Sequence, residues 1–127
     1  MEIHRLDRAA LKHEYGVDSQ RLLPWAALNA PFEGAYAVVR PGTSSTPHSH
    51  HEYELFIATR GSAFMVADGR RQPFLAGDAV YCRPGQRHEV VNEGAEDFEF
   101  FSVWWDGAMG ERFAERHLAE HRGGTDR

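Results

Sequence analysis

Three histidines and one glutamate stand at short spacings in the middle of the chain. His48, His50 and Glu54 lie close together, and His88 follows in a second segment. Imidazole nitrogens bind zinc, iron, copper and nickel, and an added carboxylate shifts the preference slightly toward the harder ions. These residue types therefore indicate one mononuclear site for a divalent metal ion.

The spacing also limits how these side chains can meet. Residues two apart in a strand point to the same face, about 6–7 Å apart, so His48 and His50 can share one ion. A continued extended chain would carry Glu54 roughly 13 Å away, whereas a metal–ligand bond is about 2 Å long. The chain must therefore bend between Ser49 and Glu54. His88 must approach from another strand, as happens when a sheet closes around a cavity.

The four residues belong to two longer patterns that have glycines at set positions. The first reads Gly-x5-His-x-His-x3-Glu-x6-Gly from Gly42 to Gly61, and the second reads Gly-x7-Gly-x2-His-x3-Asn from Gly77 to Asn92. Together they resemble the two motifs of the cupin superfamily, and the chain resembles a small single-domain cupin. The resemblance implies an all-β fold, the jelly-roll barrel or double-stranded β-helix. It also implies the metal ligands, which are His48, His50, Glu54 and His88.

One position departs from the family pattern. The second motif usually has a proline where this chain has Arg83, and Pro84 follows it. The segment from Gly77 to Gly85 keeps the family length, so we expect its turn to survive. Arg83 then becomes a cationic side chain near the site.

Two further residues are candidates for the cavity wall. If the even positions of the strand at residues 34–40 point inward, Tyr36 and Arg40 would line the site and orient an anionic substrate. The alternative for Arg40 is an exposed position beside a turn. For the strand at residues 98–105, the sequence does not say whether even or odd positions face the cavity. The catalytic candidates beside the metal are therefore Tyr36, Arg40 and Arg83.

Short β-rich runs separated by glycine-bearing turns predict the elements that position these residues. The pair Asp68-Gly69 is a hairpin signal between two of them. Apolar spacing predicts helices at residues 7–15 and 109–121. The expected strands are residues 34–40, 54–59, 63–67, 72–75, 79–83, 88–92 and 98–105.

Length and composition indicate one domain. With 127 residues and 42% hydrophobic content, the chain is large enough for a single core and too short for two. We expect an N-terminal arm (1–24), the barrel (25–107) and a C-terminal helix with a tail (108–127). The single cysteine, Cys82, excludes an internal disulfide and is expected to be a small buried strand residue.

Charge and hydropathy limit the partners. The formal net charge is −5, and the interspersed charges offer neither a basic surface for nucleic acid nor a polybasic membrane anchor. No run approaches the ~20 apolar residues of a membrane span, and no secretion signal is recognisable, so the cytoplasm is the expected compartment. Exposed edge strands and aromatic surface predict a homodimer.

A second histidine pattern lies in the predicted C-terminal helix. Residues 117–121 read His-x-x-Glu-His, the pattern of one metalloprotease group. The terminal helix of a small domain offers no third ligand and no substrate cleft. We therefore interpret this pattern as a solvated or packing face.

The metal site allows several reactions. Four protein ligands leave vacant positions on the ion, so a redox ion activating dioxygen, a Lewis acid and a metal-bound water all fit. The flanking segments at residues 23–25, 31–32, 92–97 and 103–106 resemble zinc-binding cupins found alone or fused to class I aminoacyl-tRNA-synthetase-like domains. Those fused proteins form N–N bonds in specialised metabolism.

This second resemblance implies a small-molecule substrate, a zinc ion as the first choice with iron or another transition metal left open, and a Lewis-acid rearrangement or N–N bond formation. It also implies a synthetase-like partner enzyme in bacterial specialised metabolism. Three alternatives stay open: an Fe(II) dioxygenase, a polyketide cyclase-type cupin, and a cupin that binds a small ligand without turning it over. A sensor would normally carry a DNA-binding helix pair, for which there is no room, and this favours an enzyme.

Overall fold

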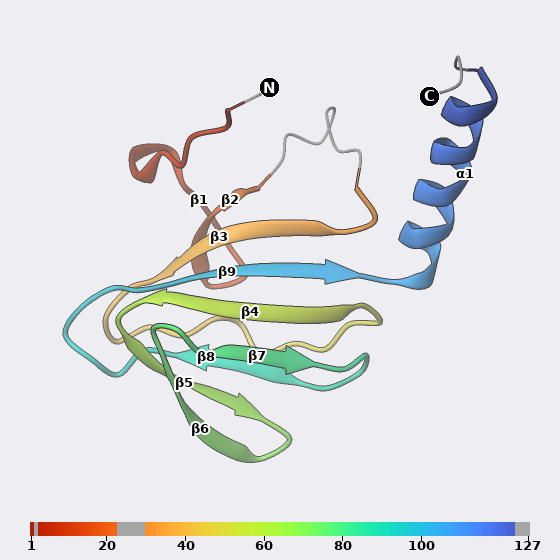
Figure 1. Ribbon diagram of the computed structural model, residues 1–127. Helices are drawn as coiled ribbons and strands as arrows, with labels where there is room; N and C mark the ends of the chain where they lie inside the picture. Colours follow the sequence, from red (N-terminus) through yellow and green to blue (C-terminus); the bar gives the residue numbers. More distant parts are fainter. Residues whose placement is uncertain (2, 23–29, 124–127) are drawn as a thin grey trace.

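Within the described part of the chain, two antiparallel β-sheets face each other and a helix extends from the end of the last strand (Figure 1). The computed structural model describes residues 1, 3–22 and 30–123. The large sheet has the strand order β1-β2-β3-β9-β4-β7, and the small sheet has the order β6-β5-β8. The strands are β1 (Lys12–Glu14), β2 (Val17–Arg21), β3 (Glu33–Val39), β4 (Tyr53–Arg60), β5 (Ser62–Ala67), β6 (Arg70–Leu75), β7 (Ala79–Cys82), β8 (His88–Val91) and β9 (Phe98–Trp105).

The all-β fold with a C-terminal helix agrees with the prediction. Each strand expected from residue 34 onward occurs, and its ends lie within about two residues of the expected ones. The helix, α1, spans Gly107–Gly123. Asp68 and Gly69 have φ values of 52° and 72°, which is the backbone of a tight hairpin turn. In the described residues no helix combines the length and apolarity that crossing a bilayer requires.

The helix predicted at residues 7–15 is wrong. A short 3-10 turn, η1 (Arg8–Ala10), leads into β1 and β2, and β2 pairs with β3. Tyr15 and Gly16 both have positive φ, so the chain reverses there and its backbone bonds go to neighbouring strands. Pairing with the sheet thus outweighs the local apolar spacing. The domain division at residue 24 stays a prediction, although β1 and β2 join the same sheet as the barrel strands.

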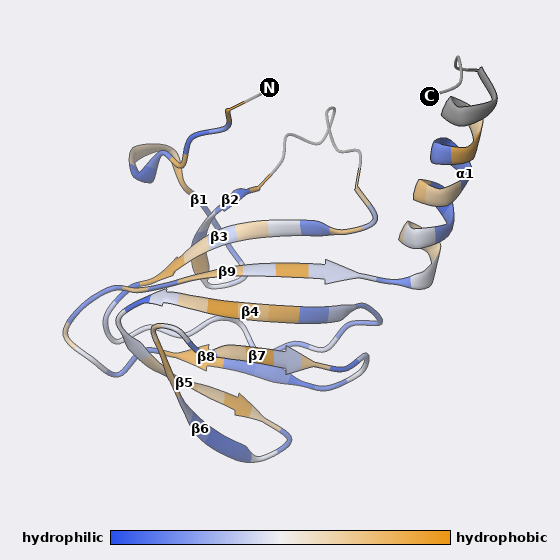
Figure 2. Ribbon diagram, in the orientation of Figure 1, coloured by the Kyte–Doolittle hydropathy of each residue, from blue (hydrophilic) through white to orange (hydrophobic). Residues whose placement is uncertain are grey.

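The core lies between the two sheets and is built from their inward-facing residues. Hydrophobic residues dominate the middle of β4, whereas β6 is largely hydrophilic (Figure 2). On β9, Phe98 and Phe100 belong to the core. The other core residues are Val17, Ala37, Val39, Phe56, Ala58, Ala63, Met65, Phe74, Cys82 and Val90.

Asn92, the last residue of the second motif, has a structural role. Its buried amide donates hydrogen bonds to the carbonyls of Val39 and Glu96, at 2.9 and 2.8 Å. Its Oδ1 accepts the Gly94 amide at 2.9 Å. Asn92 therefore ties β3 to the turn that leads from β8 to β9.

Two turn glycines allow a test of the fold. Gly61, between β4 and β5, has a φ of 83°, and a Cβ there would lie 2.6 Å from the Asp97 carbonyl oxygen. Gly69 has a φ of 72° and open space around it. Left-handed backbone strain alone costs about 1–2 kcal/mol, so Gly69→Ala should lower the free energy of unfolding by about that amount. Gly61→Ala should cost more because of the added clash. Urea unfolding measures both, and equal losses would contradict this packing.

Candidate metal centre

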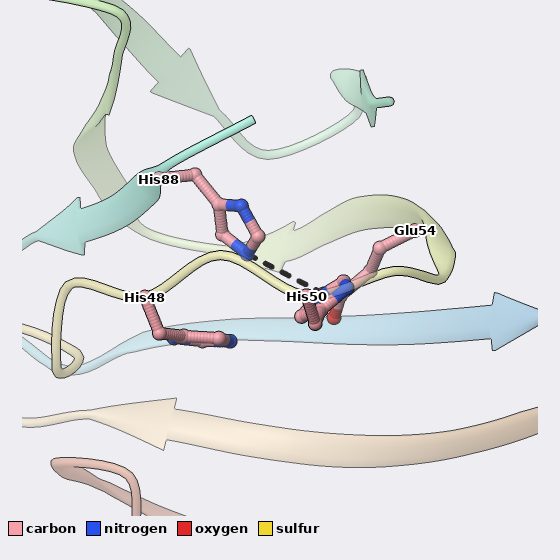
Figure 3. A group of neighbouring side chains, drawn as sticks. All are labelled: His48, His50, Glu54 and His88. Carbon is pink, nitrogen blue, oxygen red and sulfur yellow. Dashed lines mark hydrogen bonds and ion pairs between the residues drawn. The ribbon is translucent and has the colours of Figure 1, made fainter. Parts of the chain in front are cut away.

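His48, His50, Glu54 and His88 meet at one end of the barrel. Their candidate ligand atoms all lie within 4.8 Å of one another. His88 reaches the group from the start of β8, whereas His48 and His50 come from the segment before β4 (Figure 3). The chain bends at residues 51–52, which brings Glu54 back to the histidines as the spacing requires. The structure thus brings together the four residues that the resemblance implies as ligands.

Backbone hydrogen bonds join the two motifs. The amide of His48 donates to the His88 carbonyl at 3.2 Å, and the amide of His88 donates to the His48 carbonyl at 3.0 Å. The turn of the second motif is held in the same way, because the Gly85 amide donates to the His50 carbonyl at 2.8 Å. The positions of the histidines therefore follow from strand pairing.

Each of the three imidazoles is oriented by a carbonyl two residues away. The Nδ1···O distances are 2.8 Å for His48 and Thr46, 3.1 Å for His50 and Glu52, and 2.9 Å for His88 and Gln86. A carbonyl oxygen can only accept a hydrogen bond, so each Nδ1 carries the proton. In the neutral rings the Nε2 lone pair is then free to bind a metal ion. Hydrogen bonds of this kind commonly orient metal-binding histidines.

The centre of the cluster is poor in hydrogen-bond donors. Glu54 is 7% exposed, and its Oε1 lies 2.8 Å from His50 Nε2 and 3.4 Å from His88 Nε2. The buried Nε2 of His88 has no hydrogen-bond partner among the described residues. Nitrogen lone pairs facing a buried carboxylate are best satisfied by a cation. The four residues therefore fit a divalent metal ion.

Electrostatics at the cluster favour the charged carboxylate. Burial opposes ionisation of Glu54, but its interactions with His88, His50 and Ser102 outweigh burial and hold the pKa of Glu54 below its ordinary value. Burial likewise opposes the charged form of His88, yet Glu54 and the Gln86 carbonyl raise the pKa of His88. The two groups stabilise each other's charge in the metal-free protein.

The cluster opens into a cavity of about 520 Å³. Directly opposite residues of paired strands share a face, and the register places Glu33, Trp104 and Glu54 in one row across β3, β9 and β4. Ala35 and Ser102 belong to the next row. The odd positions of β3 and the even positions of β9 therefore face the cavity.

This register corrects the expected placement of Tyr36. Its side chain lies on the other face of β3, where the phenol donates to Glu99 and accepts from Arg8 Nη1 at 2.7 Å. Its ring packs against Phe101, with the centroids 5.4 Å apart. Tyr36 is therefore not among the residues that line the cavity.

Arg40 and Arg83 also lie outside the cavity wall. The guanidinium of Arg40 binds Asp18 and Asp97, each at 2.8 Å. Arg83 is exposed in the turn before β8, where its amide donates to Gln86 Oε1 at 3.2 Å. The geometry gives neither residue a contact with the cluster, and their catalytic roles stay predictions.

The β1–β2 hairpin supplies cavity residues that the sequence assigned to an N-terminal arm. They are Glu14, Tyr15, Val17, Ser19 and Arg21. The alternating positions 17, 19 and 21 face inward, but two of them are polar, so the usual apolar alternation gives no signal. The flanking segment at residues 23–25 lies outside the described residues.

The second histidine pattern lies on α1. There the rings of Phe113 and His117 stack with centroids 6.0 Å apart. The side chains at 120 and 121 lie outside the described ones. The cluster at the cavity is therefore the candidate site that the structure supports.

Comparison with known proteins gives consistent matches. The model of the family described as "Cupin domain" matches residues 35–104. A Cupin 2 conserved barrel domain protein from Salinispora arenicola is 56% identical, with 92% of this chain and 98% of that chain covered and a TM-score of 0.87. The plu4264 protein from Photorhabdus luminescens is 41% identical, with 91% and 97% covered and a TM-score of 0.86.

One curated relative carries a ligand in its name. The Oxalate-binding protein of Thermotoga maritima is 33% identical over 64 residues, which is 50% of this chain and 53% of that protein. The match thus spans about half the length of the relative.

Cys82 provides a test of how tightly the cluster region is packed. It lies opposite Glu54 on the neighbouring strand and is 1% exposed. Burial, and then the charges of Glu54 and Asp68, raise the pKa of its thiol from 9.0 to about 11. At pH 9 the folded protein should therefore hold about fifty times less thiolate than the unfolded chain. Iodoacetamide should label the native protein slower by at least this factor than the urea-unfolded protein, as mass spectrometry would show. Similar rates in both states would contradict the burial.

Proposed function

Because the chain belongs to the cupin domain family, we propose that it is a metal-dependent enzyme that acts on a small molecule. The observation that carries the proposal is the buried Nε2 of His88, which makes no hydrogen bond within the described part of the chain and faces a carboxylate and two further imidazoles. Structural metal sites are closed by protein ligands, whereas catalytic ones keep a position open. Here the cluster lines a cavity of about 520 Å³, which is the size of a small-molecule site.

We propose zinc as the ion, with iron as the alternative. His48, His50, Glu54 and His88 would hold it, and when bound it would supply Lewis-acid activation of an oxygen or nitrogen of the substrate. The protein's own contribution is to fix the ligands. Backbone carbonyls orient the three imidazoles, and the hydroxyl of Ser102 supports the carboxylate.

As the reaction we propose a rearrangement or N–N bond formation, with a synthetase-like partner enzyme that supplies the activated substrate. The resemblance of the flanking segments at residues 31–32 and 103–106 supports this choice. The negative charge of the cavity supports it as well, because a reaction of this type uses an amine, which is positively charged when protonated.

The cavity carries more negative than positive charge. Glu14, Glu33 and Glu52 line it beside Glu54, and Arg21 is the guanidinium among the described lining residues. Arg21 lies 5.0 Å from the centre of the Trp104 ring and 3.7 Å from Glu33. Even with a divalent ion bound, the four carboxylates outnumber the combined positive charges of the ion and Arg21 by one. A cavity with one dominant sign of charge concentrates ligands of the opposite sign.

We therefore propose a substrate that carries a protonated amine. The name of the Thermotoga maritima relative suggests oxalate as an alternative ligand. The carboxylates Glu14, Glu33 and Glu52 would repel such a small dianion. An amine substrate is thus the better match to this cavity.

Removal of a ligand tests the metal site. His50→Ala and His88→Ala should lose the metal from protein purified without a histidine tag, whereas His117→Ala on α1 should keep it. Metal that binds only the folded state stabilises it by about 2.7 kcal/mol at 100 times its Kd, so both ligand variants should also melt at lower temperature. Elemental analysis and thermal unfolding, with and without a chelator, provide the measurements.

Two outcomes would contradict the proposed enzyme. A wild-type protein that holds no metal would remove its basis, and metal loss from His117→Ala alone would move the site to α1. Stoichiometric zinc without oxygen uptake against candidate substrates is the expected result. Iron with substrate-dependent oxygen uptake would instead establish the dioxygenase alternative.

The charge of the cavity can be tested with a matched pair of chelators. In the metal-loaded protein, 6-aminohexanohydroxamate should bind about fivefold tighter than hexanohydroxamate, because one screened ion pair contributes about 1 kcal/mol. Glu33→Gln should reduce this preference, whereas Glu96→Gln, an equal charge change at an exposed loop position, should leave it intact. Calorimetric titration measures the affinities. A preference for the neutral compound in the wild type would overturn the amine proposal.

A further inference from the structure

Tyr15 occupies a backbone conformation that suits other residues better. Its φ is 54° at the tip of the β1–β2 hairpin, followed by Gly16 at 79°. The hairpin between β5 and β6 has the same pair of positive φ values, with Asp68 in the equivalent place. Asn, Asp and Gly tolerate this conformation, whereas for a bulky side chain it is an outlier. The turn itself therefore gives no reason for a tyrosine.

The hairpin tip lies firmly on the first motif. The carbonyl of Tyr15 accepts the Thr46 amide at 2.8 Å. A Cβ on Gly16 would lie 2.7 Å from the Ser44 carbonyl oxygen, so the two segments are in close contact there. These contacts hold the hairpin tip against Ser44 and Thr46, and Thr46 lies two residues before His48 in the first motif.

The side chain of Tyr15 points to the cluster without being buried. Its ring centroid lies 6.0 Å from that of His48, with the planes tilted by 33°, and it lines the cavity. The residue is nevertheless 64% exposed. An aromatic residue kept for packing buries most of its surface. Neither packing nor the conformation of the turn therefore explains why a tyrosine occupies this position.

We propose that Tyr15 is a ligand-contacting residue, whose ring covers a small molecule held at the cluster. This inference rests on the proposed function, because it takes the cavity to be the substrate site. Strained residues persist where the strain serves a site. Phe56, Phe100 and Trp104 also line the cavity, and aromatic walls favour a ligand with a flat, unsaturated body.

The test compares Tyr15, which lines the cavity, with Tyr81, which is also exposed but lies outside the cavity. Tyr15→Asn removes the ring and relieves the backbone, so it should raise the melting temperature by about 2–4 °C. It should also weaken benzohydroxamate binding to the metal-loaded protein by about fivefold through lost ring stacking. Tyr81→Asn, at a 49% exposed position on β7 outside the cavity, should leave the affinity unchanged and should not raise the melting temperature.

The outcomes separate this inference from the proposed function. Unchanged benzohydroxamate affinity in Tyr15→Asn, at full metal content, would overturn the role of Tyr15 alone. A lower melting temperature in Tyr15→Asn would make Tyr15 a packing residue and overturn it as well. A wild-type protein that binds neither metal nor benzohydroxamate would overturn the proposed function and this inference with it.

Discussion

The pair of backbone hydrogen bonds between His48 and His88 is the constraint on which the site depends. The two residues belong to motifs far apart in sequence, and the first motif runs antiparallel to β8 at this point. Because directly opposite residues share a face, the pairing places both imidazoles on the cavity side. Gly85 adds a bond to His50, so both histidines of the first motif are held against the second.

Orientation of the rings is a separate matter from their position. Each imidazole uses Nδ1 to bind a nearby carbonyl, which leaves Nε2 directed at the cluster. Such a group of acceptors around buried Glu54 is unfavourable in an empty protein interior. Protonation of a neighbouring imidazole offsets part of this cost, because the charged ring stabilises the charged carboxylate. A bound cation would satisfy the remaining lone pairs, including that of His88.

Much of this could be predicted from the sequence, because the glycines and ligand residues stand at the spacings of the two cupin motifs. Once Glu54 is taken as a ligand, the bend before it follows from the rise of an extended chain compared with the length of a metal–ligand bond. Other features depend on contacts that no local pattern records. Which face of β9 lines the cavity depends on its pairing with β3, and the polar β1–β2 hairpin shows no apolar alternation. The placement of Tyr36 depends on such contacts as well, since the pairing of β3 with its neighbours decides which of its residues face the cavity.

The place of β9 in the large sheet affects how the chain can fold during synthesis. β9 lies between β3 and β4, yet it follows β4 by more than thirty residues. Until it leaves the ribosome, β1, β2 and β3 cannot join β4 and β7 in one sheet. At that stage all four cluster residues have been synthesised, but β9, which completes one wall of the cavity, is still missing. Pairings this distant in sequence form slowly, so the nascent chain would expose its aromatic core longest at the wall that β9 completes.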